Sequence, residues 1–359
     1  MDKDFIIREY REGDEVSILK LRGLVLSGSK SIDWWMWQHR QNPAGPAIIT
    51  VAQSEYGSGI IGHECVVPLR IKVGENTSLS GTSIDNMVHP DYRGLGVYKQ
   101  IRQKVDELVK QGNIQFLYTF TNQVAYYINL KIGSRSLFKK TPLWVKPLRM
   151  ENNVSRYLGG NGIPSWLLTV TGRGFIKFTT RSENYKVRTQ VKEIKEVDER
   201  FDSLWEQASS HHKIMMVRDR AYLDWRYIKR PDANYTIYIS EQGNQLLGYI
   251  VVRIIEDNGL QIGWITDILT SSKETPASTD LIWRAIQYFR SNEVDLVLCT
   301  LPSRAYLAHS LRRQGFLFAS RWQKAISAVT VKLITPKYDE SFITNPHSWY
   351  ITRGDTDLI

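Results

Sequence analysis

Short apolar runs typical of buried strands alternate along the chain with stretches of helical periodicity. In the first half, strand-like runs lie at 47–52, 59–73 and 114–121. Helical stretches lie before and after the last of these runs, at 99–110 and 124–132. Early strands with a final strand-helix-strand-helix order favour a mixed sheet with helices on both faces. We therefore predict an α/β fold.

The second half repeats this pattern. Its strand-like runs lie at 235–240, 248–255 and 294–301, and a helix is predicted over 305–314. Self-similarity at a fixed offset indicates a duplicated structural unit. We predict two tandem domains, at 1–149 and 189–335, with a basic connector at 150–188 and a tail at 336–359. Residues recur in the same order at offsets of 182 to 188, in the pairs Asp14 and Asp198, Trp37 and Trp225, Gly62 and Gly248, Asp85 and Asp267, and Gly133 and Gly315.

The charge of the chain is unevenly distributed. Among 359 residues, 47 are Lys or Arg and 37 are Asp or Glu, which gives a formal charge of +10. Residues 131–190 hold 12 basic and two acidic side chains, so this segment carries the whole excess. Such a block indicates a polyanionic ligand, which could be nucleic acid, anionic lipid, a sugar nucleotide or coenzyme A.

Other composition features narrow the protein class. The two cysteines, Cys65 and Cys299, favour buried reduced thiols over a disulfide framework, and no spacing of residues suggests a metal site. The start of the chain is acidic, unlike a secretory signal, and no apolar run approaches 18 residues. We expect a cytoplasmic protein without a transmembrane segment.

A glycine-containing loop is the main candidate for binding chemistry. The residues from Val88 to Gly96 read Val-His-Pro-Asp-Tyr-Arg-Gly-Leu-Gly and run from a strand into a helix. Such a loop directs several backbone N–H groups and a helix N-terminus at one point, where phosphate binds. Glycine lets the backbone approach the phosphate closely.

This loop resembles the coenzyme A signature of the GNAT superfamily of acyl-CoA-dependent N-acyltransferases, Val-x-Pro-x-Tyr-Arg-Gly-x-Gly. Asn122-x-x-Ala125, with Gly133 downstream, is similar to a second family motif. The resemblance implies that Met87 and Val88 pair with the pantetheine and that Asn122 contacts the cofactor arm. It also implies that the pyrophosphate is held by the backbone amides of Arg93, Gly94, Leu95, Gly96, Val97 and Tyr98.

The sequence departs from the family pattern at two positions. Tyr98 stands where Gly or Ala is usual, which crowds the start of the helix. Asn129 stands where the family often has a tyrosine that protonates the departing thiolate. Tyr126, one helical turn away, or its neighbour Tyr127 could replace that tyrosine, although packing is the competing interpretation of Tyr126.

The second half lacks the phosphate loop. Its aligned segment, 275–278, reads Thr-Pro-Ala-Ser, which has no glycine and includes a residue without an N–H donor. We expect one coenzyme site in the chain.

Acyl transfer to an amine needs a base, because only the neutral amine attacks a thioester. Asp85 lies on the strand beside the loop and is the first candidate, although Asp267 at the matching position of the other copy suggests a shared structural role. Glu64 is a weaker candidate and is expected to be a solvated strand residue.

The tail offers a third possibility. In tandem members of the superfamily, such as N-myristoyltransferases and aminoglycoside-acetylating enzymes, the C-terminal carboxylate enters the active site. Residues 349–359 combine aromatic and apolar anchors with Asp355 and Asp357. The resemblance implies that one of these carboxylates, or the terminal one, reaches the cleft.

The leading hypothesis is an N-acyltransferase that moves an acyl group, most simply acetyl from acetyl-CoA, to a primary amine of a small molecule or amino sugar. Direct attack in a ternary complex is expected, because no Cys or Ser with a paired His is evident. The alternatives are a Fem-like or mycothiol-synthase-like tandem transferase and a non-catalytic module that binds acyl-CoA or a polyanion. The intact loop favours coenzyme A over nucleic acid as the polyanion.

Overall fold

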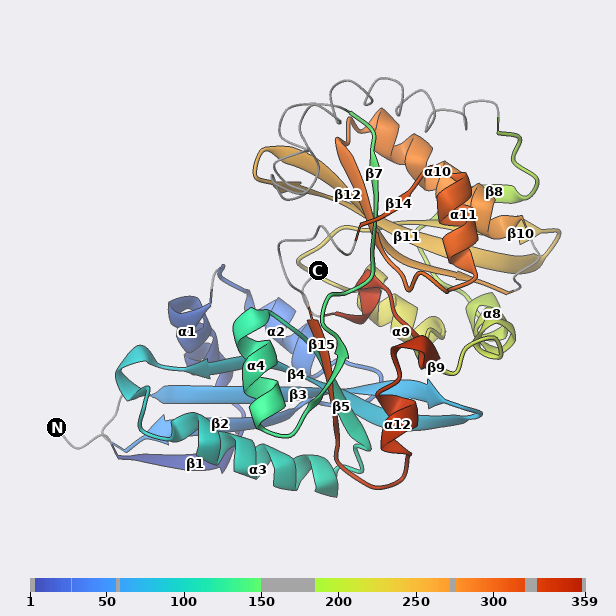
Figure 1. Ribbon diagram of the computed structural model, residues 1–359. Coiled ribbons are helices and arrows are strands. Elements are labelled where there is room, and N and C mark those ends of the chain that lie inside the picture. The colour runs from blue at the N-terminus through green and yellow to red at the C-terminus, as the bar shows by residue number, and fades with distance from the viewer. Residues whose placement is uncertain are drawn as a thin grey trace.

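The computed structural model describes residues 4–26, 28–55, 59–149, 185–271, 276–319 and 328–356. These residues form two lobes, each built on one mixed β-sheet with helices packed against it (Figure 1). The α/β fold with two mixed sheets is therefore confirmed. Most of the predicted basic connector, and Asp357 in the tail, lie outside the described residues.

The first sheet has strand order β1-β2-β3-β4-β5-β15-β6, and on this path β4 and β5 are the parallel neighbours. A short ribbon, β9 (Ile214–Met216) with β16 (Trp349–Tyr350), extends the far end of β3. The strands of the main path are β1 (Phe5–Glu9), β2 (Ile48–Ser54), β3 (Ile60–Val73), β4 (Asn76–Val88), β5 (Phe116–Thr121), β6 (Arg135–Phe138) and β15 (Ala328–Leu333).

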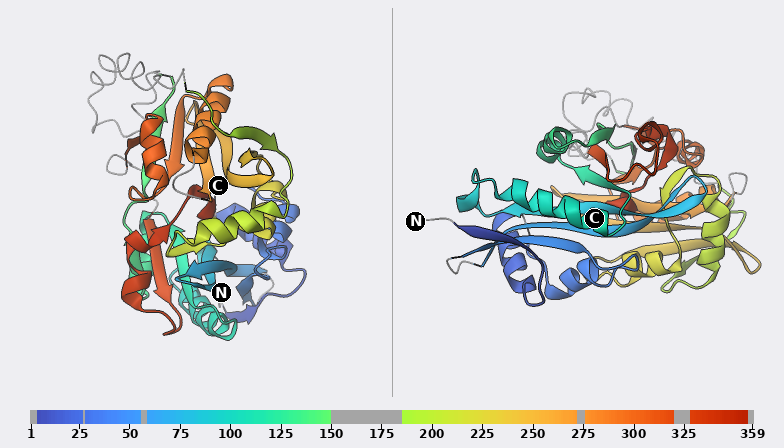
Figure 2. Two further views of the ribbon diagram at one scale, coloured as in Figure 1. Left: turned by 90° about the vertical axis from the view of Figure 1, so that its right-hand side faces the viewer. Right: turned by 90° about the horizontal axis from the view of Figure 1, so that it is seen from below.

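Helices cover both faces of the first sheet, as Figure 2 shows from below. Helix α3 (Val97–Gln111) buries an apolar stripe that includes Val97, Ile101 and Val105 against one face, on which α4 (Gln123–Lys131) also lies. Helices α1 (Glu15–Val25) and α2 (Ile32–His39) cover the other face. Within the described residues, no helix is long and apolar enough to cross a membrane.

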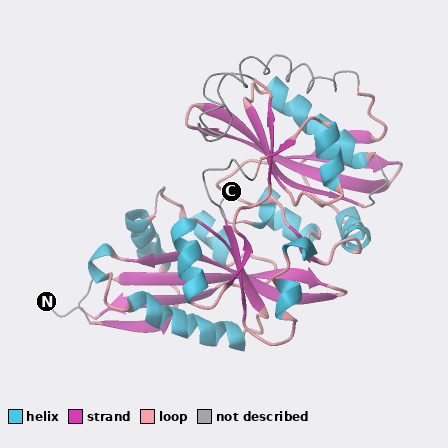
Figure 3. Ribbon diagram, viewed as in Figure 1, coloured by secondary structure: helices cyan, strands magenta, loops and turns pink. Residues whose placement is uncertain are grey.

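Figure 3 shows a second sheet with helices packed against it. Its strand order is β14-β7-β13-β12-β11-β10-β8, which repeats the arrangement of the first sheet. A bulge interrupts β12 at Thr266, next to Asp267, as one interrupts β4 near Asp85. The strands are β7 (Leu143–Pro147), β8 (Gln190–Ile194), β10 (Thr236–Gln242), β11 (Gln245–Asp257), β12 (Leu260–Thr270), β13 (Leu296–Thr300) and β14 (Leu317–Phe318). The helices in the second half of the chain are α8 (Arg200–Ser209), α9 (Arg220–Leu223), a π-helical turn (Asp224–Ile228), α10 (Ala277–Ser291), α11 (Leu307–Arg313) and α12 (Glu340–Ile343), of which α12 lies beside the first sheet (Figure 1).

The two halves exchange one strand each. Strand β7, from the first half of the chain, lies between β13 and β14 of the second sheet. Strand β15, from the second half, lies between β5 and β6 of the first sheet. The predicted segment boundaries at 149 and 335 therefore divide the sequence but do not divide the sheets.

The duplication predicted from the sequence is visible in the register of the strands. Gly62 pairs with Val88 in the first sheet, and Gly248 pairs with Thr270 in the second. These pairs correspond at offsets of 186 and 182.

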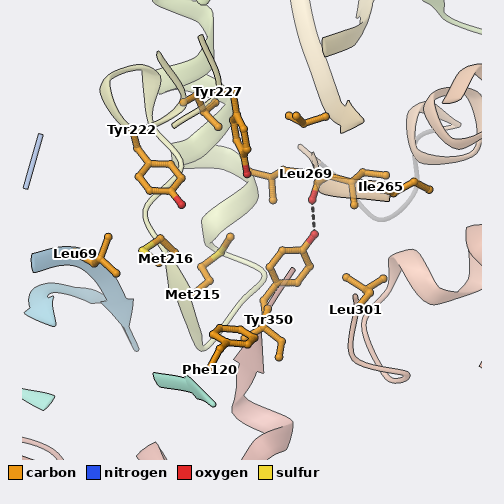
Figure 4. Packing of buried hydrophobic residues seen from close by; sticks show 14 of the residues in the cluster. Leu69, Phe120, Met215, Met216, Tyr222, Tyr227, Ile265, Leu269, Leu301 and Tyr350 are labelled. Carbon is orange, nitrogen blue, oxygen red and sulfur yellow. Dashed lines mark hydrogen bonds between the residues drawn. The ribbon is translucent and has the colours of Figure 1, made fainter. Parts of the chain in front are cut away.

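A shared core joins the sheets. Tyr350 lies among Phe120, Met215 and Leu301, and its hydroxyl donates a hydrogen bond to the Ile268 carbonyl of β12 (Figure 4). Residues of the first sheet, the second sheet and the tail thus belong to one apolar cluster, so burial of apolar surface ties the lobes together.

Candidate functional site

A wedge opens between the parallel strands β4 and β5 of the first sheet. The β4–β5 pairing is anchored by Gly81 opposite Leu117 and by a 2.9 Å hydrogen bond from the Gln115 amide to the Leu79 carbonyl. Beyond Gly81, no further β4–β5 pairing occurs in the described residues. The edge of β4 up to Val88 is therefore available to a ligand.

The predicted glycine loop lies at the end of this strand. Gly94 and Gly96 have φ of +81° and +78°, a left-handed conformation that favours glycine. Gly96 is the N-cap of the 15-residue helix α3, and the Gln100 amide bonds to the Gly96 carbonyl at 3.2 Å. The first-turn amides have no acceptor within the helix, so they and the helix dipole form an anion site.

The loop is exposed on one side and firmly held on the other. Arg93 and Leu95 are exposed, whereas Val97 is buried in the α3 core. Gly62 of β3 allows this close packing, because a Cβ there would lie 2.7 Å from Ile101 Cδ1. Tyr98 is partly buried, and burial, reinforced by the nearby Glu64, raises the pKa of its hydroxyl.

Met87 and Val88 differ in their surroundings. Met87 is 1% exposed and belongs to the core, where it pairs with His63 of β3. Val88 is half-buried, and its carbonyl accepts a 3.3 Å hydrogen bond from Arg93 Nε. Val88 is the last residue of β4, so its backbone lies nearer the glycine loop than that of Met87.

A buried polar network, which sequence reasoning missed, lines the wedge. The Arg102 guanidinium bonds to Glu64 and, at 2.7 Å, to Asp106. Ser83 Oγ donates to Glu64 Oε1 at 2.9 Å, and Lys332 of the exchanged strand reaches Asp106 at 2.8 Å. The expectation that Glu64 is solvated was wrong, because this side chain is fully buried.

Two atoms of this network are left without a partner. Glu64 Oε2 and Arg102 Nε are buried and make no hydrogen bond in the described structure. Burial raises the pKa of Glu64 although Arg102 opposes the shift, whereas Arg102 and Lys332 outweigh burial and lower the pKa of Asp106. An amide-bearing ligand in the wedge could satisfy such atoms. The sequence signal that could have indicated this network is Arg102, a basic residue on the apolar face of α3.

The first turns of α4 hold the other predicted residues. Asn122 caps the helix, since its side-chain oxygen accepts a 2.9 Å bond from the Ala125 amide. Tyr126 is 7% exposed and Tyr127 is 56% exposed, so only Tyr126 belongs to the interior. Asn129 lines the wedge and donates to Thr330 of the exchanged strand at 3.0 Å.

Asp85 lies in the β4 bulge with φ of +50°. Its carboxylate pairs with Arg22 at 3.3 Å, and its carbonyl accepts a 2.8 Å hydrogen bond from His63 Nδ1. The matching Asp267 is fully buried and is paired with Arg218 at 3.1 Å. The two matched carboxylates therefore have different surroundings.

The tail lies between the two sheets. Asp355 is 6% exposed, and its carboxylate accepts bonds from Arg218 Nη2 at 2.8 Å and from the Thr352 amide at 2.8 Å. Burial raises its pKa, and Arg218 opposes that shift. With Thr82 of β4, Asp355 lines a hollow of about 20 Å³ on the face opposite α3.

Two buried histidines lie behind the bulge. His39 and His63 are fully buried, with ring centroids 6.5 Å apart. Burial lowers the pKa of His39 to about 4, and it also lowers the pKa of His63. Both imidazoles are therefore neutral near pH 7.

The corresponding wedge of the second sheet is closed by Tyr306. This hydroxyl donates to the Thr270 carbonyl at 3.0 Å and accepts from the Thr270 amide at 3.3 Å. Thr270 is the counterpart of Val88, so the backbone groups that would meet a coenzyme are already bonded. The residue matching Tyr306 at the same offset is Val124, which is 70% exposed.

Sequence comparison identifies the first domain. Residues 6–130 match the family model described as an acetyltransferase (GNAT) domain, a range that spans the glycine loop and most of α4. A comparison with curated proteins found no significant match.

Solved structures share the fold over nearly the whole chain. A GCN5-related N-acetyltransferase of Anabaena variabilis has a TM-score of 0.65 at 15% identity, covering 92% of this chain and 73% of its own. A probable N-acyltransferase of Enterococcus faecalis, described as a conserved protein of unknown function, has a TM-score of 0.63 at 9% identity, with coverages of 93% and 73%. Saccharomyces cerevisiae N-myristoyltransferase with bound myristoyl-CoA has a TM-score of 0.58 at 10% identity, with coverages of 93% and 80%.

Proposed function

We propose that this chain, whose residues 6–130 match the acetyltransferase (GNAT) domain model, is an N-acetyltransferase that transfers acetyl from acetyl-CoA to a primary amine of a small molecule. The observation that carries the proposal is the alignment of the open β4 edge with the left-handed Gly94 and Gly96 turn at the start of α3. A strand edge that leads into a phosphate-binding helix N-terminus suits a long nucleotide-linked thioester.

The chain's own residues fit such a cosubstrate. The amides from Gly94 to Tyr98 would hold the pyrophosphate, and the edge of β4 near Val88 would pair with pantetheine amides. Arg102 Nε and Glu64 Oε2, both unpartnered in the wedge, would gain polar partners. Bound acetyl-CoA supplies an acyl group whose C–S bond breaks, releasing the thiol, as the C–N bond to the amine forms.

The space around the wedge favours a small acyl group. The hollow lined by Ser83, Arg102 and Thr330 on the α3 face has a volume of about 10 Å³, and the hollow beside Thr82 on the opposite face about 20 Å³. Each has about the size of one water molecule. A methyl group suits such spaces better than a long alkyl chain.

Asp85 is our candidate base among the predicted carboxylates. It lies in the bulge of the open strand and is only partly buried, whereas Asp355 is fully engaged by Arg218 and Thr352. Asp355 therefore serves to hold the tail to Arg218, which also pairs with Asp267 of β12. Tyr126, on the buried side of α4, is the candidate acid for the departing thiolate.

Titration calorimetry with acetyl-CoA tests cosubstrate binding. We expect saturable binding that Arg93→Glu combined with Gly96→Val weakens at least tenfold. Lys110→Glu combined with Gly112→Val is a matched control near the other end of α3, and its melting temperature monitors folding. Absent binding, or equal weakening by both pairs, would reject the proposal.

Thiol release in a panel of amines tests the transfer. Asp85→Asn should lower kcat while leaving acetyl-CoA affinity unchanged, since a base acts after binding. Coenzyme binding without thiol release from any amine would point to a binding module.

A further inference from the structure

A large basic pocket lies away from the wedge, where the two lobes meet. Its volume is about 620 Å³, within the range of small-molecule sites. Lys139, Lys140, Lys213 and Arg304 line it, together with His211, His212 and His347. None of the described lining residues is acidic.

Structured segments carry these cations, whose side chains are exposed to solvent. Lys139 and Lys140 lie on the short crossing between β6 and β7, where Phe138 pairs in the first sheet and Leu143 pairs in the second. Lys213 directly precedes β9, and its carbonyl accepts a 2.8 Å bond from the Gly74 amide. The strand exchange thus brings lysines of the first half to a cation of the second.

The floor of the pocket is aromatic. The His212 ring lies 4.3 Å from that of Tyr350 and 5.6 Å from that of Tyr306. His211 Nε2 lies 3.2 Å from the Ser271 carbonyl. Ring contacts therefore hold His212 at the floor of the pocket, while its neighbour His211 lies at the Ser271 carbonyl.

Three of the four lining cations belong to no ion pair that the described residues form. Lys139, Lys213 and Arg304 take part in none of the ion pairs among the described residues. Another hollow, near α9, shows the contrast, since its Lys229 is paired with Asp224 at 2.5 Å. Like charges held together repel one another, so an anion in the basic pocket would be stabilised.

We propose that this basic pocket binds a small polyanion, a molecule with two or more phosphate or carboxylate groups, at a site separate from the glycine loop. The test is titration calorimetry of inorganic pyrophosphate into protein that holds one equivalent of coenzyme A, which occupies the loop and leaves the pocket open to the probe. We expect saturable binding that Lys139→Gln with Arg304→Gln weakens at least tenfold.

The control removes equal charge elsewhere. Lys20→Gln with Lys110→Gln, both exposed on the first lobe, should leave pyrophosphate affinity within twofold. Equal weakening by both pairs, or no saturable binding, would overturn the proposal. If Lys139→Gln with Arg304→Gln does not fold, Lys213→Gln alone should weaken binding at least threefold.

Two further titrations separate this site from the proposed function. Arg93→Glu with Gly96→Val should bind pyrophosphate as the unmodified protein does, even where acetyl-CoA binding is lost. Inorganic phosphate should bind at least tenfold more weakly than pyrophosphate, and equal affinity would contradict a polyanion site.

Discussion

Trp37 and Trp225 bond to each other reciprocally. The Trp37 indole donates to the Trp225 carbonyl at 2.7 Å, and the Trp225 indole donates to the Trp37 carbonyl at 2.9 Å. Their rings stack with centroids 5.0 Å apart. Two residues that match in the internal repeat therefore meet on its approximate twofold axis.

Trp37→Phe and Trp225→Phe should each lower the free energy of unfolding by about 1–3 kcal/mol, because a buried carbonyl loses its donor. Urea unfolding measures the loss. Trp205→Phe, at a partly buried site, is the control, and an equal effect there would show that ring size rather than the reciprocal bond matters.

Gly94→Ala and Gly96→Ala should weaken acetyl-CoA binding at least tenfold, because alanine strains the left-handed turn that aims the amides. Gly74→Ala, at a hairpin φ of +61°, imposes similar strain far from the loop. Its melting temperature should fall similarly while its affinity stays unchanged. Equal affinity losses would indicate a general stability effect.

Asp355→Asn should destabilise the protein by about 3–5 kcal/mol, since it leaves Arg218 buried with less compensation. Glu293→Gln, which breaks the exposed pair with Arg149, should cost less than about 1 kcal/mol. Denaturant unfolding compares the two. A small loss in Asp355→Asn would mean that Asp267 alone neutralises Arg218.

Acidification should destabilise the protein through His39. The unfolded chain takes up a proton below pH 6.5, whereas folded His39 resists protonation until about pH 4. The stability contributed by neutral His39 is therefore lost between pH 6.5 and 4, by at most about 3 kcal/mol. His39→Phe should flatten the pH dependence of unfolding over this range, and exposed His309→Phe should not.

Tyr306→Phe should lower stability by about 1–3 kcal/mol, because the Thr270 amide and carbonyl lose their partner. Coenzyme stoichiometry should remain one per chain, since the second copy has no glycine loop. Calorimetry measures both the unmodified protein and the variant, and a stoichiometry of two in either would contradict this account.

The sequence predicted the features that depend on local residue types. Glycine at 94 and 96 is needed for a left-handed turn, and the repeated Trp37 and Trp225 disclosed the duplication. The strand exchange had no such signal. Residues 143–147 and 328–333 are apolar strands that would bury similar side chains in either sheet, so pattern alone does not select the partner.

The network around Arg102 shows a different limit. A basic residue on an apolar helix face indicates a buried acidic partner, but here that partner, Glu64, lies on the distant strand β3. The other acid that Arg102 contacts, Asp106, also pairs with Lys332 of β15. Such pairings depend on tertiary packing. The sequence therefore predicted the glycine turn between β4 and α3, which the structure shows, while it misjudged the environment of Glu64.

The exchanged strands also determine the order in which the sheets can form while the chain is being synthesised. In the first sheet β15 lies between β5 and β6 and pairs with both. Strand β6 therefore cannot pair in this sheet until residues 328–333 have left the ribosome. Contacts between segments so far apart in sequence form slowly. The edge of β5 is meanwhile open to wrong partners, so a nascent N-terminal half would benefit from a chaperone until the far end of the chain arrives.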